Sequence, residues 1–276
     1  MIPGPAGVPI PCTPHFDRTA VPPPRPGSTR IELLVVFAVI GVLAGMLLPA
    51  LSKAKEGARS TVGKSNLRQL SIGMLVCADD PQGSLCRPGL TDRGNTHPRH
   101  AADWVSDGRP DADTNDRTRW KTPGYGFHAE AGPLFPDLLS RARSPYRETS
   151  TESFPVHRCP CTGPQGKALR VTFSRNRLLD PGAPIGDGAS EGGPKGTQIN
   201  GVRRPSIKVL LVNETPRTMK NAAFHPDGSA INGSFVRHDG RVDFAPMDAH
   251  VEALRDRRGG EIQRPGFQSK MYHPST

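Results

Sequence analysis

Four residues near the C-terminus have the side chains of a metal site: His238, Asp243, Asp248 and His250. Imidazole nitrogens and carboxylate oxygens are common ligands of divalent cations, so these residue types permit a bound metal ion. The same residues allow a second interpretation, in which His238 and Asp248 hydrogen-bond the backbone of hairpin turns, as aspartates often do. The pattern favours the second interpretation and leaves the metal ion as the alternative.

Other combinations of reactive side chains have no supporting spacing. The chain contains no P-loop and no HExxH motif, and no Cys–His or Ser–His–Asp set is arranged as nucleophilic catalysis requires. We therefore expect no enzyme activity.

Five cysteines are present: Cys12, Cys77, Cys86, Cys159 and Cys161. If the N-terminal segment with Cys12 is removed, four remain, an even number that fits an extracytoplasmic protein with optional disulfides. Cys77 and Cys86 are close enough in sequence to close a small loop. Cys159 and Cys161 are too close for an easy mutual disulfide, and they lack the CxxC spacing of a zinc site.

Composition predicts a small core with long loops. Apolar residues make up 35% of the 276 residues, and Gly and Pro number 30 each. The net charge of +10 favours anionic partners. Because the basic residues are scattered and aromatic residues are only 5%, a nucleic-acid partner is not expected.

A single carboxylate, Glu32, precedes the longest apolar run in the chain. From Leu33 to Leu48 every residue is apolar or glycine, which just suffices for a helix to cross a bilayer. A carboxylate at the rim of the hydrocarbon needs a partner or must reach the interface. Two partners are open: Arg30, or the free amine of a chain that begins at Ser28, in the same or a neighbouring subunit.

The apolar run also contains features that predict helix packing. Gly41 and Gly45 form a GxxxG face, which lets two helices approach closely in lipid. Pro49 lacks a backbone donor and predicts a kink at the membrane surface. Beyond it, an apolar stripe at helical spacing predicts an amphipathic continuation that needs a sheet to cover it. The stripe comprises Leu51, Ala54, Ala58, Val62, Leu67, Leu70, Met74 and Cys77.

The decapeptide Gly-Ser-Thr-Arg-Ile-Glu-Leu-Leu-Val-Val, from Gly27 onward, resembles the prepilin cleavage and methylation motif of type IV pilins and type II secretion pseudopilins. The resemblance implies that a prepilin peptidase cuts between Gly27 and Ser28 and methylates the amine of Ser28. It implies that Glu32, fifth in the mature chain, sets the register between subunits, and that Pro49 kinks the helix. Ser28 and Arg30 depart from the family, which usually has Phe and Leu there.

A second resemblance extends further. Residues 48–60, 66–74 and 78–80 are similar to pseudopilin-like proteins abundant in planctomycete and verrucomicrobial bacteria, as is the Cys-Pro pair at Cys159. His238, nine residues, then Asp-Ala-His-Val resembles the C-terminal element of that branch, with Ala249 in place of Gly. Several major pseudopilins hold calcium near this end, so the resemblance implies Ca²⁺ as the ion if His238, Asp243, Asp248 and His250 bind one.

The expected fold is α+β and pilin-like. We expect a leader at 1–27, a long helix at 28–79 (transmembrane at 31–48, amphipathic at 50–79) and an extracytoplasmic globular domain at 80–276 with an irregular insertion at 80–130. The helix should pack on a three- to five-stranded antiparallel sheet. The expected strands lie at 168–174, 203–213, 233–237, 241–246 and 250–254, with a hairpin turn at 239–240 and one short helix near 134–142.

The favoured function is a structural pilin-like subunit of type II secretion or a related filament. It would cross the inner membrane once, with its globular domain outside the cytoplasm. A count of basic flanking residues slightly favours the opposite orientation, but the margin is one residue. Expected partners are the prepilin peptidase, other pilin or pseudopilin subunits and inner-membrane lipid. Two alternatives stay open: a monomeric membrane-tethered module that binds a ligand or metal, and a DNA-uptake pseudopilin.

Overall fold

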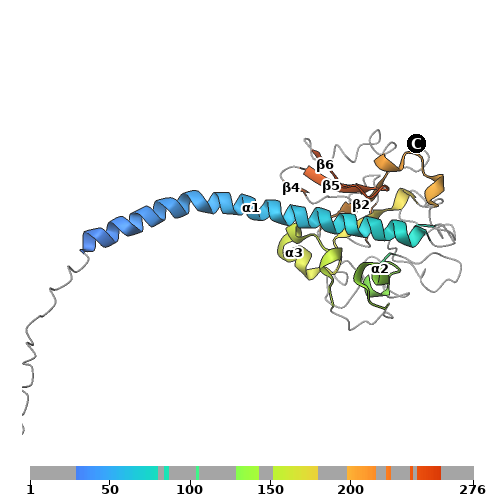
Figure 1. The fold of residues 1–276 in the computed structure, drawn as a ribbon, viewed down its shortest axis with the longest axis horizontal. Coiled ribbons are helices and arrows are strands. Elements are labelled where there is room, and N and C mark those ends of the chain that lie inside the picture. The colour runs from blue at the N-terminus through green and yellow to red at the C-terminus, as the bar shows by residue number, and fades with distance from the viewer. Residues whose placement is uncertain are drawn as a thin grey trace, which may run out of the picture. The chain divides into compact units, whose positions relative to one another are not determined.

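The computed structural model describes residues 29–79, 84–86, 104–105, 129–142, 152–179, 198–215, 222–224, 237–238 and 241–255 (Figure 1). The chain divides into two compact units, Met1–Leu51 and Ser52–Thr276. Each unit is described by itself.

The described part of the first unit belongs to helix α1, which spans Arg30–Ala78 and so continues into the second unit. This confirms the long helix that the apolar periodicity predicts. Its most apolar 18-residue window has a mean hydropathy of 2.7 and none of that window is buried. By length and composition, α1 can cross a membrane.

Pro49 lies inside α1 and does not end it. A proline at this position has no amide to donate to the carbonyl of Gly45, four residues earlier, so the helix lacks one of its backbone hydrogen bonds there. The predicted kink rests on this lost bond and stays a prediction.

In the second unit, α1 is buried only along its last four turns. Its buried apolar side chains are Leu67, Leu70, Met74 and Ala78, and Cys77 is half-buried. The first half of the predicted stripe is wrong: Leu51 is 65% exposed, Val62 is 49% exposed, and the alanines between them are exposed. The slip in spacing between Val62 and Leu67 marks the point at which burial by the rest of this unit begins.

The second unit contains a sheet of four antiparallel strands in the order β1-β2-β5-β6. They are β1 (Phe173–Asn176), β2 (Val209–Asn213), β5 (Arg241–Pro246) and β6 (Glu252–Arg255). Two strands of two residues extend it. β3 (Ala223–Phe224) runs parallel to β1, and β4 (Arg237–His238) pairs antiparallel with the start of β5.

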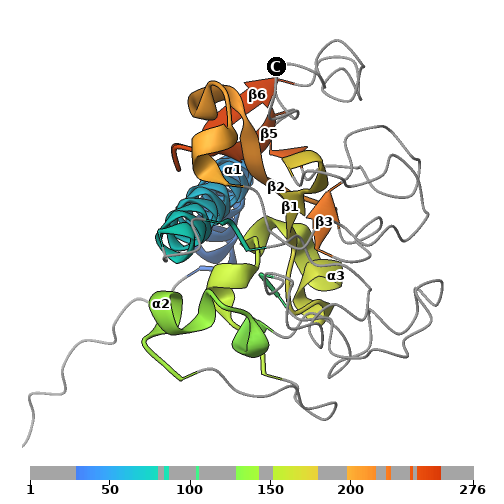
Figure 2. The same cartoon turned by 90° about the vertical axis from the view of Figure 1, so that its right-hand side faces the viewer.

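Alternate residues of the strands face two separate apolar clusters. Leu211 and Ala245 are paired across β2 and β5 and belong to the cluster that contains the buried face of α1. Val212 and Phe244, the next pair, belong to the cluster on the other face. The register shifts between Val209 and Leu211, as a β-bulge does, which is why these two residues fall in different clusters. Figure 2, viewed at 90° to Figure 1, shows the sheet beside α1.

The sequence locates some strands and misplaces others. β5 has the predicted bounds, β2 fills the second half of the predicted 203–213 strand, and β6 lies within two residues of prediction. Residues 168–174 are wrong as a strand: α3 (Gly163–Ala168) ends there and β1 begins at Phe173. The sheet also has a parallel pair that the prediction lacked. Residues 239–240 lie outside the described part, although the β4–β5 register leaves two residues between the strands, as a hairpin requires.

Short helices and buried anchors complete the second unit. The predicted helix near 134–142 is α2, which spans Phe135–Leu139 and has Pro136 in its first turn. Single turns of 3₁₀-helix lie at Ala129–Ala131, Pro155–His157, Pro160–Thr162, Arg177–Leu179, Ile199–Gly201 and Pro205–Ile207. Most of the predicted insertion at 80–130 lies outside the described residues. Its described parts include Leu85 and Trp104, which are fully buried in the core.

Candidate functional site

Glu32 forms a capping box at the start of α1. The backbone amide of Thr29 donates to Glu32 Oε2 at 2.7 Å, and the amide of Glu32 donates to Thr29 Oγ1 at 3.3 Å. These reciprocal bonds satisfy two of the amides that every helix N-terminus leaves without an intrahelical acceptor. Threonine followed three residues later by glutamate is a sequence signature of this motif. The carboxylate therefore has a local partner that the sequence interpretation missed.

The carboxylate lies at the start of a helix segment that no other described residue of its own unit covers. Every large apolar side chain from Ile31 to Leu51 is between 52% and 73% exposed. Glu32 and Arg30 form no ion pair with each other in the described residues, so the competition expected from Arg30 is not seen there. Gly27 and Ser28, the predicted cleavage and methylation residues, lie outside the described residues.

Gly41 and Gly45 leave open space on α1. A Cβ atom added at either position would meet nothing within 4 Å. The glycines therefore have no packing reason within the described chain, and a second helix could approach closely at this place. Together with Glu32 and Pro49 they form one exposed segment, which we call the assembly segment, residues 30–51.

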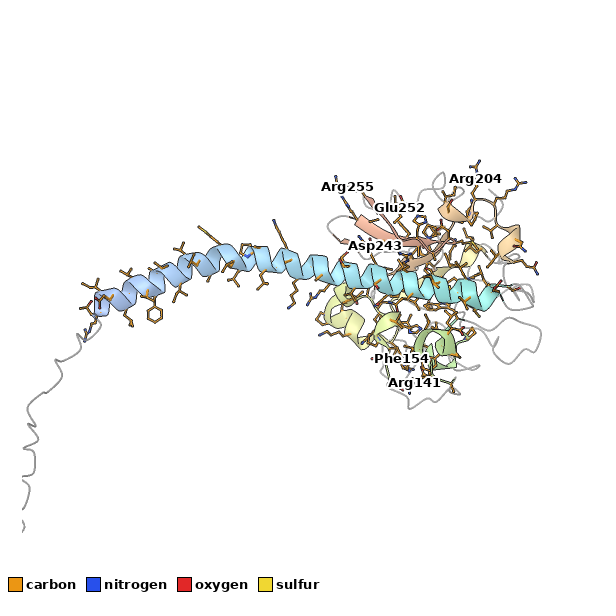
Figure 3. All side chains as sticks on the ribbon, in the orientation of Figure 1. Arg141, Phe154, Arg204, Asp243, Glu252 and Arg255 are labelled. Atoms are coloured by element: carbon orange, nitrogen blue, oxygen red, sulfur yellow. The ribbon has the colours of Figure 1, made fainter. Side chains whose placement is uncertain are left out.

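The predicted metal ligands separate into two places. Asp243, on β5, is almost fully buried, and its Oδ1 lies 3.7 Å from Lys64 Nζ of α1. Asp248 and His250 lie in and just after the turn between β5 and β6, and both are exposed. Figure 3 labels Asp243 beside α1.

Asp248 uses its carboxylate within the turn. Its Oδ1 accepts from the backbone amide of His250 at 3.3 Å and also contacts Nδ1 of that imidazole. His238 forms part of β4, and its side chain lies outside what the structure describes. No three histidine, cysteine or carboxylate side chains come together as metal ligands among the described residues. The hydrogen bonds of Asp248 are those expected if its carboxylate stabilises a hairpin turn.

The Cys-Pro element packs against α1 at Gly63. A Cβ atom at Gly63 would lie 2.9 Å from Cys159 Sγ, so only glycine lets the two segments approach this closely. No disulfide joins Cys77, Cys86, Cys159 or Cys161. Burial raises the pKa of the Cys159 thiol, and burial followed by the neighbouring Cys159 raises that of Cys161. Both thiols stay protonated at neutral pH, which makes them poor nucleophiles.

A buried ionisable cluster was not predicted from the sequence. Arg170 Nη2 donates to Glu130 Oε1 at 2.6 Å, and both side chains are 6% exposed. His157 stacks on Trp104 with ring centroids 6.1 Å apart and is 1% exposed. Burial lowers the pKa of His157 to about 4, with Glu130 acting to raise it and Arg170 to lower it. The cluster joins segments far apart in sequence, so no local pattern could have found it.

One pattern in the sequence is an exception to the statement that no catalytic spacing is present. Residues 188–192 read Gly-Ala-Ser-Glu-Gly, which matches the GxSxG pattern of serine hydrolases. That pattern has meaning only at a strand-to-helix turn, and these residues lie outside the described part of the chain.

Comparisons of the chain with protein-family models, with curated proteins and with solved structures found no match. The fold and the assembly segment define a class only: an α+β protein whose described residues include an N-terminal helix that is long and apolar enough to cross a membrane.

Proposed function

We propose that this chain is a pilin-like structural subunit, made with a leader, cut between Gly27 and Ser28, anchored in the inner membrane and assembled through the assembly segment. The observation that carries the proposal is a helix with uncovered apolar side chains and a carboxylate, Glu32, in its first turn. Covering each such side chain contributes about 1.5–3 kcal/mol, so a bilayer or neighbouring helices must surround the segment.

The position of Glu32 supports assembly over simple anchoring. A membrane tether needs only apolar length, and a carboxylate at its edge works against insertion. A subunit in a filament of packed helices can use that carboxylate to bind a cation at one height, which sets the register. In this proposal the amine of Ser28 in a neighbouring subunit is the cation, and the capping box orients the carboxylate toward the helix start.

The first experiment reads the N-terminus of the membrane-extracted protein by mass spectrometry. We expect a chain that begins at Ser28 with a methylated amine. A chain that keeps residues 1–27 in the membrane would contradict the processing step. Type II secretion or a related filament is the proposed setting, with the sheet domain outside the cytoplasm.

The second experiment separates the charge of Glu32 from its role in the helix cap. Glu32→Gln removes the charge, yet glutamine at this position still forms a capping box. Thr29→Ala removes half of the capping box and keeps the charge. We expect Glu32→Gln to stay in the membrane and to be lost from filaments, while Thr29→Ala assembles. Normal assembly of Glu32→Gln would refute the register role.

A crosslinking experiment distinguishes an assembled subunit from a monomeric tethered module. Cysteines introduced at Gly41 and Gly45 should form helix–helix adducts in membranes if the glycines face a neighbouring subunit. The absence of adducts at both positions, with the protein still membrane-bound, would favour the tethered module.

A further inference from the structure

A groove of about 280 Å³ lies in the second unit between α1 and the segment 155–167. The α1 side is formed by Arg59, Val62 and Asn66. The opposite side is formed by the Cys-Pro element and α3, including Arg158 and Lys167. The assembly segment is not part of it. The proposed filament assembly does not involve this groove, so we consider separately what the groove could bind.

Three cations line the groove, and no carboxylate of the described residues does. They are Arg59, Arg158 and Lys167. In the part of the chain that the structure describes, none of the three forms an ion pair. Glu56 lies three residues before Arg59 on α1 but does not line the groove. Like charges held around one cavity repel each other, and a bound anion relieves that repulsion.

Hydrogen bonds hold the groove in shape and satisfy three of its backbone carbonyls. Asn66 Nδ2 donates to the carbonyls of Pro155 and Arg158, both at 2.9 Å. The hydroxyl of Thr162 donates to the carbonyl of Cys159 at 2.7 Å. The two Asn66 bonds tie the wall of the groove to α1, and all three bonds satisfy backbone oxygens that would otherwise repel an anion.

The types of donor that line the groove suit an oxyanion. Arg158 Nη1 donates to the carbonyl of Lys167 at 3.1 Å, which orients the guanidinium and leaves other N–H groups of its fork for a ligand. Guanidinium groups bind phosphate oxygens through two parallel hydrogen bonds, and an ammonium adds a point charge. The volume is near the lower end for small-ligand pockets, enough for a phosphate with a short attached group.

We propose that this groove binds a phosphate group through Arg59, Arg158 and Lys167. Two sources carry that chemistry: the headgroup of an anionic phospholipid, and a soluble phosphate compound. The proposal is independent of filament assembly, because the groove lies within the second unit.

The test uses the full chain in an uncharged detergent, with two probes. Native mass spectrometry measures retention of phosphatidylglycerol against phosphatidylcholine, and titration calorimetry measures binding of pyrophosphate. The groove variant is Arg59→Gln/Lys167→Gln, since both side chains are exposed and their loss should not disturb the fold. The matched control is Arg68→Gln/Arg255→Gln, which removes the same charge from exposed residues outside the groove.

We expect the groove variant to bind at least about tenfold more weakly than the wild type, and the control to bind like the wild type. A third variant, Val62→Trp, should also weaken binding because it fills the groove and leaves the charge unchanged. Retention of phosphatidylglycerol without pyrophosphate binding identifies a headgroup, and pyrophosphate binding identifies a soluble phosphate. Equal effects of the groove and control variants, or no binding of either probe, would overturn the proposal.

Discussion

The buried pair of Arg170 and Glu130 offers a quantitative test of the structure. Glu130→Gln keeps the shape of the side chain and removes the carboxylate charge that Arg170 Nη2 contacts, in a place that is 6% exposed. Breaking a buried ion pair by removing one partner costs about 3–5 kcal/mol. Because glutamine can still accept a hydrogen bond, we expect a loss near the lower end, about 3 kcal/mol.

The chain supplies a matched control in an exposed pair of the same types. Arg141 Nη1 lies 2.9 Å from Glu152 Oε1, and the two side chains are 58% and 53% exposed. Exposed pairs contribute about 0–1 kcal/mol, so Glu152→Gln should change the free energy of unfolding by less than about 1 kcal/mol. Arg141 also lies 5.8 Å from the ring of Phe154, a contact that this variant keeps (Figure 3).

The assay is urea unfolding of the full chain in an uncharged detergent, followed by tryptophan fluorescence, since Trp104 is fully buried. For Glu130→Gln the midpoint should fall by about 1 to 2 M urea. Adding Arg170→Met to Glu130→Gln should recover part of the loss, because an apolar side chain needs no counter-charge. Equal effects of Glu130→Gln and Glu152→Gln would refute the argument from burial.

Three further predictions concern single residues of the second unit. Ala249 has a φ of 61°, in the left-handed region that glycine adopts freely, so Ala249→Gly should raise the free energy of urea unfolding by about 1 kcal/mol; a destabilised variant would contradict this. The pKa of His157 is about 4 in the folded chain and about 6.5 in the unfolded chain. The unfolded chain therefore binds more protons between these values, and stability should fall by up to about 3 kcal/mol from pH 7 to pH 4. His157→Phe should lose this part of the pH dependence, and an unchanged pH profile would be inconsistent with a neutral buried imidazole. Burial raises the pKa of Cys159, so iodoacetamide at pH 8 should label it only after denaturation, as peptide mass spectrometry can show; rapid labelling of the native chain would argue against its burial.

The helix α1 illustrates how far a local pattern reaches. The apolar run and the helical spacing predict a helix over residues 28–79, and the observed helix spans Arg30–Ala78. The same spacing places Leu51 and Val62 in a buried stripe, yet both are exposed. A period shows which residues share a face, whereas burial depends on where another segment lies against it.

Gly63 and Ala249 show the same difference between local pattern and tertiary structure at single residues. Gly63 reads as an ordinary small residue in a helix, and only the structure shows Cys159 Sγ 2.9 Å from its missing Cβ. Nothing local in the sequence marks the backbone of Ala249, and only the structure shows its positive φ, a conformation that glycine adopts more freely.

The sequence by itself determined the features that depend on neighbours in the chain. These are the helix with its apolar length, and the strand at Arg241–Pro246. Only the tertiary structure decided the parallel pairing of β3, the buried contact of Arg170 with Glu130, and the groove at Arg59, Arg158 and Lys167. The physical reason is that these contacts join residues far apart in sequence, whose proximity no period or spacing encodes.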